Sequence, residues 1–119
     1  MIRGMHGMFY TSEPAALREF FRDKLGFPAH DAGGGWLIFD MPEADLGCHP
    51  AEQHQEGAAS GTPSISFYCD DLKQTVAELK SKGVIFVDEI ANHGYGLVTH
   101  CQAPGGFLLQ LYQPLYKKA

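Results

Sequence analysis

Residues 5–113 contain the same order of segments twice, and few folds accommodate such a repeat. Each copy is a strand-like segment, a helix, a glycine and three further strand-like segments. Phe9-Tyr10 matches Phe67-Tyr68 at an offset of 58, and Phe21 matches Leu79 at the same offset. A half with one helix can bury only one face of its sheet. The two halves must therefore pack against each other or against a partner.

In the first half, residues 5–11 are expected to form a strand, and Ser12 is expected to cap a helix with Pro14 in its first turn. The apolar residues of this helix recur at spacings of three and four, which is typical of one buried helix face; they are Leu17, Phe20, Phe21 and Leu25. Gly26 should end the helix. Further strands are expected at 27–30, 36–41 and 44–49.

The second half begins with an expected strand at 64–69. Asp70 or Asp71 should then cap a helix that ends at Gly83. Its apolar positions keep helical spacing, and they are Leu72, Val76 and Leu79. The remaining strands are expected at 84–90, 96–101 and 107–113.

Residues 51–63 are polar, small and rich in turn formers, and they interrupt both patterns. We therefore expect a single domain over 1–119. Its two modules, 1–50 and 64–119, are joined by the loop 51–63. The fold class that follows is α+β.

One face of the expected sheets carries polar side chains. Strand residues alternate between faces, so Phe67 and Leu111 point toward the helix while their neighbours point away. The side chains on the second face are His6, Tyr10, Asp45, His49, Ser64, Ser66, Tyr68, Gln110 and Tyr112. Three tyrosines among these polar groups indicate a cavity with apolar walls and a few convergent polar groups. A solvated face is the alternative, and His100 can face either side.

Composition excludes several classes of protein. The net charge is −5 with no basic run, which argues against nucleic-acid binding. No segment has the roughly 20 apolar residues of a membrane span, and no signal peptide is recognised. The three cysteines form no C-x-x-C pair. Free thiols in a cytoplasmic protein are therefore expected.

The sequence resembles the vicinal oxygen chelate superfamily, which includes glyoxalase I, bleomycin-resistance proteins and extradiol dioxygenases. The segments that carry the resemblance are HGMFYTSEPAALREFFRDKLGF, SISFYCDDLKQTVAELKSKGVIF and APGGFLLQLYQP. The resemblance implies two βαβββ modules whose sheets curl into an open, barrel-like sheet. It also implies a homodimer, because members of this superfamily often pair modules across two chains.

Metal-dependent members of the superfamily place ligands on the first and last strands of each module. The resemblance therefore implies His6, His49 and Gln110 as metal ligands, with Asp45 or Gly47 as other choices of register for His49. The family usually has glutamate where Gln110 stands, and the matching first-strand residue Ser64 is a poor ligand. The implied cofactor is one divalent ion (Zn, Ni, Mn or Fe), or none.

Two functions remain open at this point. One is an enzyme, a lyase, isomerase or dioxygenase, in which a metal ion polarises a small oxygenated substrate. The other is a metal-free protein that sequesters a drug or metabolite. Gln110 cannot act as a base, which argues against the glyoxalase I reaction, although His6 or His49 could serve. The expected ligand-binding residues are Tyr10, Ser64, Ser66, Tyr68 and Tyr112, and no catalytic residue is assigned.

Overall fold

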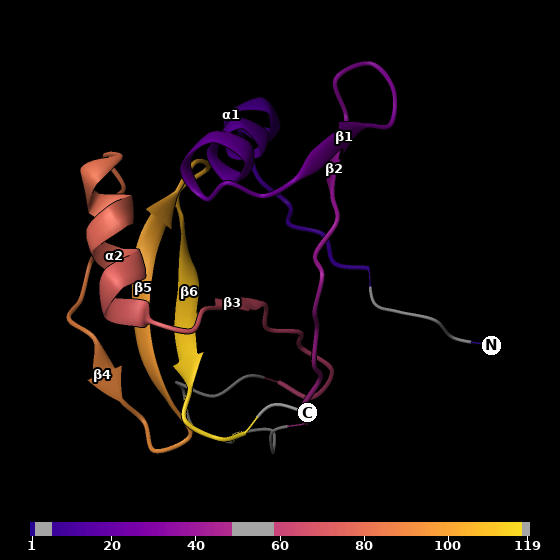
Figure 1. Ribbon diagram of the computed structural model, residues 1–119. Coiled ribbons are helices and arrows are strands. Elements are labelled where there is room, and N and C mark those ends of the chain that lie inside the picture. Colours follow the sequence, from indigo (N-terminus) through magenta and orange to yellow (C-terminus); the bar gives the residue numbers. More distant parts are fainter. Residues whose placement is uncertain (2–5, 49–58, 118–119) are drawn as a thin grey trace.

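The computed structural model describes residues 1, 6–48 and 59–117. Its larger sheet has four strands in the order β3-β6-β5-β4 (Figure 1). β3 runs parallel to β6, and the other neighbours are antiparallel. The strands are β3 (Ser66–Tyr68), β4 (Ala91–Asn92), β5 (Gly96–Ala103) and β6 (Phe107–Pro114).

The helix α2 (Leu72–Ser81) joins β3 to the rest of this sheet. Asp71 is its N-cap, and its side chain accepts a hydrogen bond from the Gln74 backbone N–H at 3.1 Å. Gly83 follows the helix with a φ of +87°, a conformation that glycine adopts without strain. β3, α2, β4, β5 and β6 follow one another in the order expected for the second half, although β4 lies at 91–92, after the strand expected at 84–90.

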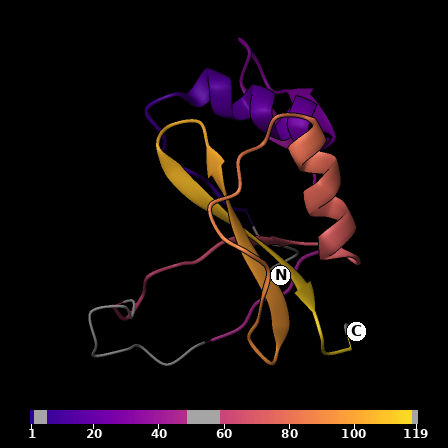
Figure 2. The ribbon, with the colours of Figure 1, turned by 90° about the vertical axis from the view of Figure 1, so that its left-hand side faces the viewer.

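The first half contains α1 (Pro14–Glu19), which continues as a π-helical turn, η1 (Phe20–Lys24). A two-stranded antiparallel sheet follows, made of β1 (Ala29–Asp31) and β2 (Leu37–Phe39). Figure 2 shows α1 lying across the end of the β5–β6 hairpin. No helix in the described part of the chain is long and apolar enough to span a bilayer.

The mixed α+β class with an open sheet is confirmed, but several expected elements differ. Residues 6–11 and 44–48 form no strand. Ala, Asp and Gly at 44, 45 and 47 are residues that strands avoid. Leu46 is 83% exposed, so no burial offsets this preference. Of the strand expected at 84–90, one isolated bridge forms, between Phe86 and Cys101.

Ser12 is not the helix cap that the sequence suggested. The N-cap of α1 is Glu13, and its side chain does not cap the helix. The Glu13 carboxylate instead accepts a hydrogen bond from the Gly105 N–H at 3.0 Å. The Thr11 hydroxyl donates to the Pro104 carbonyl at 3.1 Å. The start of α1 is therefore held to the turn between β5 and β6.

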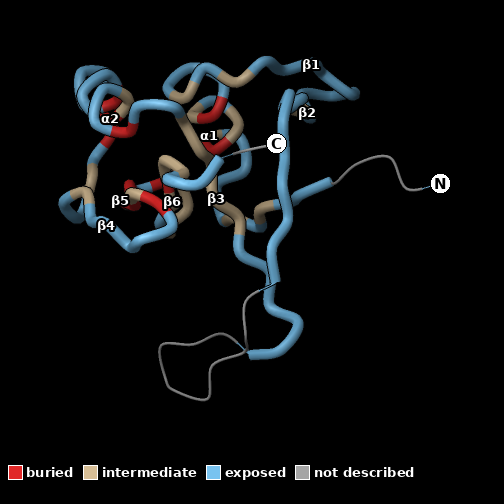
Figure 3. Tube along the Cα trace, turned by 60° about the horizontal axis from the view of Figure 1, so that its bottom comes forward, coloured by how far each residue is buried: buried red, intermediate tan, exposed pale blue. Residues whose placement is uncertain are grey.

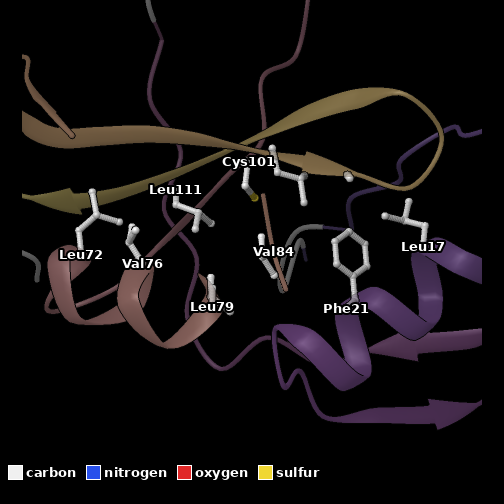
Figure 4. Close-up of a cluster of buried hydrophobic side chains, with 10 residues drawn as sticks. Leu17, Phe21, Leu72, Val76, Leu79, Val84, Cys101 and Leu111 are labelled. Carbon is white, nitrogen blue, oxygen red and sulfur yellow. The ribbon is translucent and has the colours of Figure 1, made fainter. Parts of the chain in front are cut away.

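One hydrophobic core joins the two halves. Figure 4 shows Leu72, Val76 and Leu79 of α2 facing the sheet, beside Leu17 and Phe21 of the first helix. The Phe21 ring centroid lies 5.8 Å from that of Phe67 in β3 and 5.5 Å from that of Phe39 in β2. Burial is concentrated in the helices and in β5 and β6 (Figure 3).

The two helices also touch at their C-terminal ends. The Lys24 Nζ donates to the Lys82 carbonyl at 2.6 Å, and the Lys82 Nζ lies 3.4 Å from the Lys24 carbonyl. These lysines stand at the offset of 58 that relates the two halves in the sequence. Such a reciprocal contact is what an approximate twofold relation between two modules produces. The module boundaries 1–50 and 64–119 remain a prediction.

The hydrogen bonds of Thr11 and Glu13 with the β5–β6 turn, which we call the clasp, should make substitution of Gly105 more destabilising than substitution of Gly106. A Cβ on Gly105 would overlap the Thr11 hydroxyl, whereas one on Gly106 meets open space; both residues have positive φ. Gly106→Ala should cost about 1–2 kcal/mol of unfolding free energy. Gly105→Ala should cost about 3 kcal/mol or more, because the hydrogen bonds of the clasp are also lost. Equal losses in urea denaturation would show that the clasp does not stabilise the fold.

Candidate functional site

The face of the larger sheet that points away from α2 carries a row of three polar side chains. Ser66 pairs with Gln110, and Gln110 pairs with His100, across β3, β6 and β5. Side chains at paired positions lie on the same face. The residues between them, Phe67, Thr99 and Leu111, point to the helix side, where Thr99 and Leu111 are buried. The structure therefore places His100 on the polar face, which the sequence left open.

A second row of paired residues lies directly beside the first. It consists of Tyr68, Tyr112 and Val98. The ring centroids of Tyr68 and Tyr112 are 6.1 Å apart, and the ring centroids of Tyr95 and Tyr112 are 6.5 Å apart. The face thus combines a polar row with a wall of tyrosine rings.

The hydroxyl of Tyr112 begins a short chain of hydrogen bonds. It lies 3.0 Å from the Tyr116 hydroxyl, which donates to Asp45 Oδ2 at 3.2 Å. Since Tyr116 donates to the carboxylate, it accepts from Tyr112. Burial, then this hydrogen bond and the charge of Asp45, raise the pKa of Tyr112. Tyr112 therefore remains a neutral hydroxyl at ordinary pH.

His100 is held by a residue that the sequence reading did not single out. Asp88 Oδ2 lies 2.7 Å from His100 Nδ1, and Asp88 Oδ1 accepts hydrogen bonds from the His100 backbone N–H at 2.9 Å and the Thr99 hydroxyl at 2.7 Å. The other ring nitrogen, His100 Nε2, lies 3.3 Å from Gln110 Oε1. Asp88, His100 and Gln110 thus form a continuous hydrogen-bonded chain, which we call the Asp88–His100–Gln110 chain.

A bulge at the sheet edge brings Asp88 to this position. Phe86 pairs with Cys101 and Ala91 pairs with Val98. Residues 87–90 therefore stand opposite only 99 and 100 on β5. Extra residues on one strand form a bulge that redirects side chains, and here the redirected side chain is the Asp88 carboxylate.

The ionised form of Asp88 is favoured. Partial burial raises the pKa of this carboxyl group, but the hydrogen bonds from Thr99 and His100 outweigh that effect, so the net pKa lies below its ordinary value. An ionised carboxylate can only accept hydrogen bonds, so His100 Nδ1 must carry the proton between the two groups.

The strand pairing does not bring the remaining predicted site residues together. His6 is exposed, on a segment that passes beside Ile65 just before β3. Tyr10 is 92% exposed. Ser64 is exposed and precedes β3, and His49 lies outside the described residues. Among the expected ligand-binding residues, Ser66, Tyr68 and Tyr112 are the ones that the strand pairing brings together.

The described residues do not by themselves complete a metal site. Across 6–48 and 59–117, no three His, Cys, Asp or Glu side chains are arranged to hold an ion. The Gln110 amide oxygen faces His100 Nε2, so this contact already occupies part of its capacity to accept or to coordinate. The donors present on the face are a serine, an amide and an imidazole, a weak set for a divalent ion. The site of His6, His49 and Gln110 remains a prediction.

A separate pocket of about 340 Å³ lies on the helix side of the sheet, between α2 and the bulged edge. Its walls include Lys73 and Lys80 of α2 and Asp88, Glu89 and Ile90 of the edge segment. Asp88 therefore borders this pocket while its carboxylate holds the imidazole on the opposite face.

The sequence contained a signal for His100 but none for Asp88. The turn at 104–106 joins Ala103 to Phe107 as a pair, and counting outward from it pairs His100 with Gln110. The contact between Asp88 and His100 depends on a bulge, and no local pattern of residues in the sequence predicts this bulge.

The sequence and the fold are similar to those of known proteins. A family model described as Glyoxalase/Bleomycin resistance protein/Dioxygenase superfamily matches residues 5–111. Among solved structures, TnmS3, an antibiotic binding protein from Streptomyces sp. CB03234, aligns with a TM-score of 0.60 at 21% identity, covering 87% of this chain and 88% of that one. No curated protein matches the sequence.

Two further solved structures are similar. A lactoylglutathione lyase from Agrobacterium tumefaciens aligns with a TM-score of 0.56 at 17% identity, covering 88% of each chain. An integron cassette protein from V. cholerae aligns with a TM-score of 0.55 at 16% identity, covering 95% of this chain and 98% of that one. At these identities the structures show a shared fold alone.

The hydrogen bonds of Asp88 predict a loss of stability in acid. Because the folded pKa is lowered, the contribution of this carboxylate is present above its unfolded pKa of about 3.9 and is lost as the pH falls below it. Asp88→Asn should cost roughly 1 kcal/mol at neutral pH, since the group is partly exposed, and should flatten the decline below about pH 4. The control is Asp40→Asn, whose carboxylate is 80% exposed. If the free energy of unfolding, measured by urea titration, depended on pH in the same way in both variants, the stabilising role of the Asp88 carboxylate would be contradicted.

Proposed function

The chain belongs to the glyoxalase/bleomycin resistance protein/dioxygenase superfamily, and on that premise we propose that it binds a small oxygenated molecule on the polar face of its larger sheet. The observation that carries the proposal is the pairing of Ser66, Gln110 and His100 in one row beside Tyr68 and Tyr112. A few convergent polar groups against aromatic walls are the usual composition of a small-molecule site.

The polar groups on this face can form hydrogen bonds with oxygen atoms of a ligand. The serine hydroxyl and the glutamine amide can each donate and accept hydrogen bonds, so they complement hydroxyl and carbonyl groups. Tyrosine rings supply rigid apolar area against which the carbon skeleton of a ligand can pack. The raised pKa of Tyr112 favours its neutral hydroxyl over a phenolate. Tyr10 and Ser64 remain predicted contributors.

We place metal-free binding ahead of metal-dependent chemistry. The support is the donor set, in which a neutral amide stands at Gln110 and is turned toward His100 at 3.3 Å. TnmS3, an antibiotic binding protein, shares the fold, and so does a lactoylglutathione lyase. The metal-dependent alternative rests on His6, His49 and Gln110.

Binding on this face should depend on Gln110. The probes are a set of hydroxyketones, hydroxy acids and antibiotics that carry hydroxyl and carbonyl groups, added to ¹⁵N-labelled protein and followed by amide shifts. A compound that binds should shift residues of β3, β5 and β6, and Gln110→Leu should weaken it by roughly tenfold through loss of a buried hydrogen bond. The matched control is Gln74→Leu, because Gln74 is exposed on α2 and its amide contacts Glu78. Shifts confined to other regions would overturn the proposed site.

The same titration separates the two chemical classes. In the presence of EDTA, a metal-free site should bind the same compound with unchanged affinity. Loss of binding with EDTA, recovered with Zn²⁺ or Ni²⁺ and abolished in His6→Ala, would establish the metal-dependent alternative instead.

We also propose that two copies of the chain associate. The extended segments 6–11 and 40–48 carry Tyr10 and Leu46, which are 92% and 83% exposed. Figure 3 shows the second segment exposed along its described length. Apolar side chains of this size, on segments without strand partners, are what a second protomer would cover.

A dimer makes a measurable prediction. Light scattering after size exclusion should give twice the chain mass of 13.1 kDa, and Leu46→Glu should shift the population to monomer because a carboxylate would be buried in the interface. Ile85→Glu is the control, since Ile85 is 59% exposed on the opposite half. A wild-type protein that is monomeric at all concentrations would refute association.

A further inference from the structure

We propose that the molecule bound on the polar face is an alkyl aryl ketone, with its aromatic ring against Tyr112, its carbonyl group at Gln110 and its alkyl chain over Leu108. The inference rests on the proposed binding function and names the class of ligand. Leu108, Gln110 and Tyr112 alternate along β6 and therefore point to the same face. Successive side chains on one face of a strand lie about 6.5 Å apart, so one elongated molecule can contact all three.

The Tyr112 end of this face is aromatic and already excludes water. The Tyr112 ring has the rings of Tyr68 and Tyr95 beside it, at centroid distances of 6.1 Å and 6.5 Å. Val98 pairs with Tyr112 and is only 4% exposed, although it points away from the helices. Aromatic rings favour offset or edge-to-face contact with other aromatic rings. This end of the face is therefore suited to a planar ring of the ligand.

The middle of the face offers a hydrogen-bond donor. Gln110 Oε1 is directed to His100 Nε2 at 3.3 Å, so the NH₂ of the same planar amide is directed elsewhere. An amide NH₂ donates hydrogen bonds and cannot accept them. The Ser66 hydroxyl, which pairs with Gln110 across β3 and β6, can provide a second donor. The ligand must therefore supply an acceptor.

The acceptor should be neutral. A carboxylate also accepts hydrogen bonds, but β3, β5 and β6 contain no lysine or arginine that would compensate its charge. Moving an uncompensated carboxylate out of water is costly. The carbonyl oxygen of a ketone accepts without carrying a charge, and it is therefore the better match.

The opposite side of the polar row is bordered by aliphatic side chains. Phe86 pairs with Cys101 and packs against the core. Its neighbours Ile85 and Val87 therefore point to the other face of the sheet, where they are 59% and 46% exposed.

Leu108 continues this aliphatic border on β6. It is 52% exposed and pairs with Gln102, whose backbone N–H donates to the Ile85 carbonyl at 2.8 Å. Ile85 and Leu108 therefore lie on either side of Gln102. An alkyl chain placed over them removes apolar surface of both the chain and the protein from water.

The two ends of the face also give the orientation of the ligand. Near the tyrosines, the Tyr116 hydroxyl binds both Tyr112 and Asp45, so the segment around Asp45 closes this end. The aliphatic end carries no such cover on Leu108. A compact ring suits the closed end, and a flexible chain suits the exposed end toward the β5–β6 turn.

Three ketones test the ligand class, with amide shifts of ¹⁵N-labelled protein as the readout. Butyl phenyl ketone has the ring, the carbonyl and the chain, butyl cyclohexyl ketone has a saturated ring, and methyl phenyl ketone lacks the chain. Butyl phenyl ketone should have the lowest Kd. Saturation of the ring should raise the Kd roughly threefold or more, although it makes the compound more apolar. Loss of the chain should raise it roughly fivefold.

Substitutions then assign each end. Leu108→Ser should give butyl and methyl phenyl ketone similar Kd values, because the chain has lost its contact. Tyr112→Leu should remove the advantage of phenyl over cyclohexyl, and Tyr68→Leu is the second variant for this end. Each ratio compares two ligands on the same protein, so a general loss of affinity cancels. The control is Leu115→Ser, which should keep both ratios, because Leu115 is 48% exposed and follows β6.

The outcomes separate the ligand class from the binding function. Equal Kd values for the phenyl and cyclohexyl ketones in the wild type, or a chain advantage that persists in Leu108→Ser, would overturn the proposed class while binding on this face stands. If a hydroxy acid shifts residues of β3, β5 and β6 and no ketone does, the ketone proposal is refuted and the binding function holds. If no compound shifts these strands, both proposals fail.

Discussion

The register of the β5–β6 hairpin decides where almost every important side chain of this protein lies. Pairing runs without interruption from Ala103 with Phe107 to Gly96 with Pro114. It sends Leu109, Leu111 and Cys101 into the core and His100, Gln110 and Tyr112 to the opposite face. Since side chains alternate strictly along a strand, a shift by one residue would exchange these two sets. The clasp of Thr11 and Glu13 on the turn ties the first helix to the same register.

The Asp88 carboxylate contributes both to the stability of the fold and to the candidate site. Thr99 is 1% exposed, and a hydroxyl buried that far needs a hydrogen-bond partner. Asp88 supplies it at 2.7 Å and uses its second oxygen to hold His100. The requirement of the core for a satisfied hydroxyl therefore fixes the carboxylate that orients the imidazole. This coupling explains why the bulge at 87–90 is compatible with a stable edge of the sheet.

The two halves are joined by apolar contact rather than by continuous backbone pairing in the described residues. Phe21 lies on η1, the continuation of the first helix, and its ring contacts Phe39 of β2 and Phe67 of β3, one in each sheet. Aromatic rings bury large areas and tolerate several relative angles, which suits a junction between two related but unequal units. The first half lacks the strands expected at 5–11 and 44–49 within its described residues, so its sheet has two strands and leaves Leu46 exposed.

Local chemistry in the sequence was sufficient for the helices, their glycine ends, the long hairpin and the alternation that puts Gln110 and Tyr112 on one face. These features depend on residues close in the chain, where spacing, caps and turns act directly. The resemblance of three segments to a known superfamily was sufficient for the fold class. Tertiary structure alone decided that Asp88 meets His100, that His100 shares a row with Ser66, and that Glu13 binds a turn instead of capping its helix. Each of these contacts joins segments whose relative placement depends on a bulge, a parallel pairing or a distant turn, and no local pattern of residues encodes those.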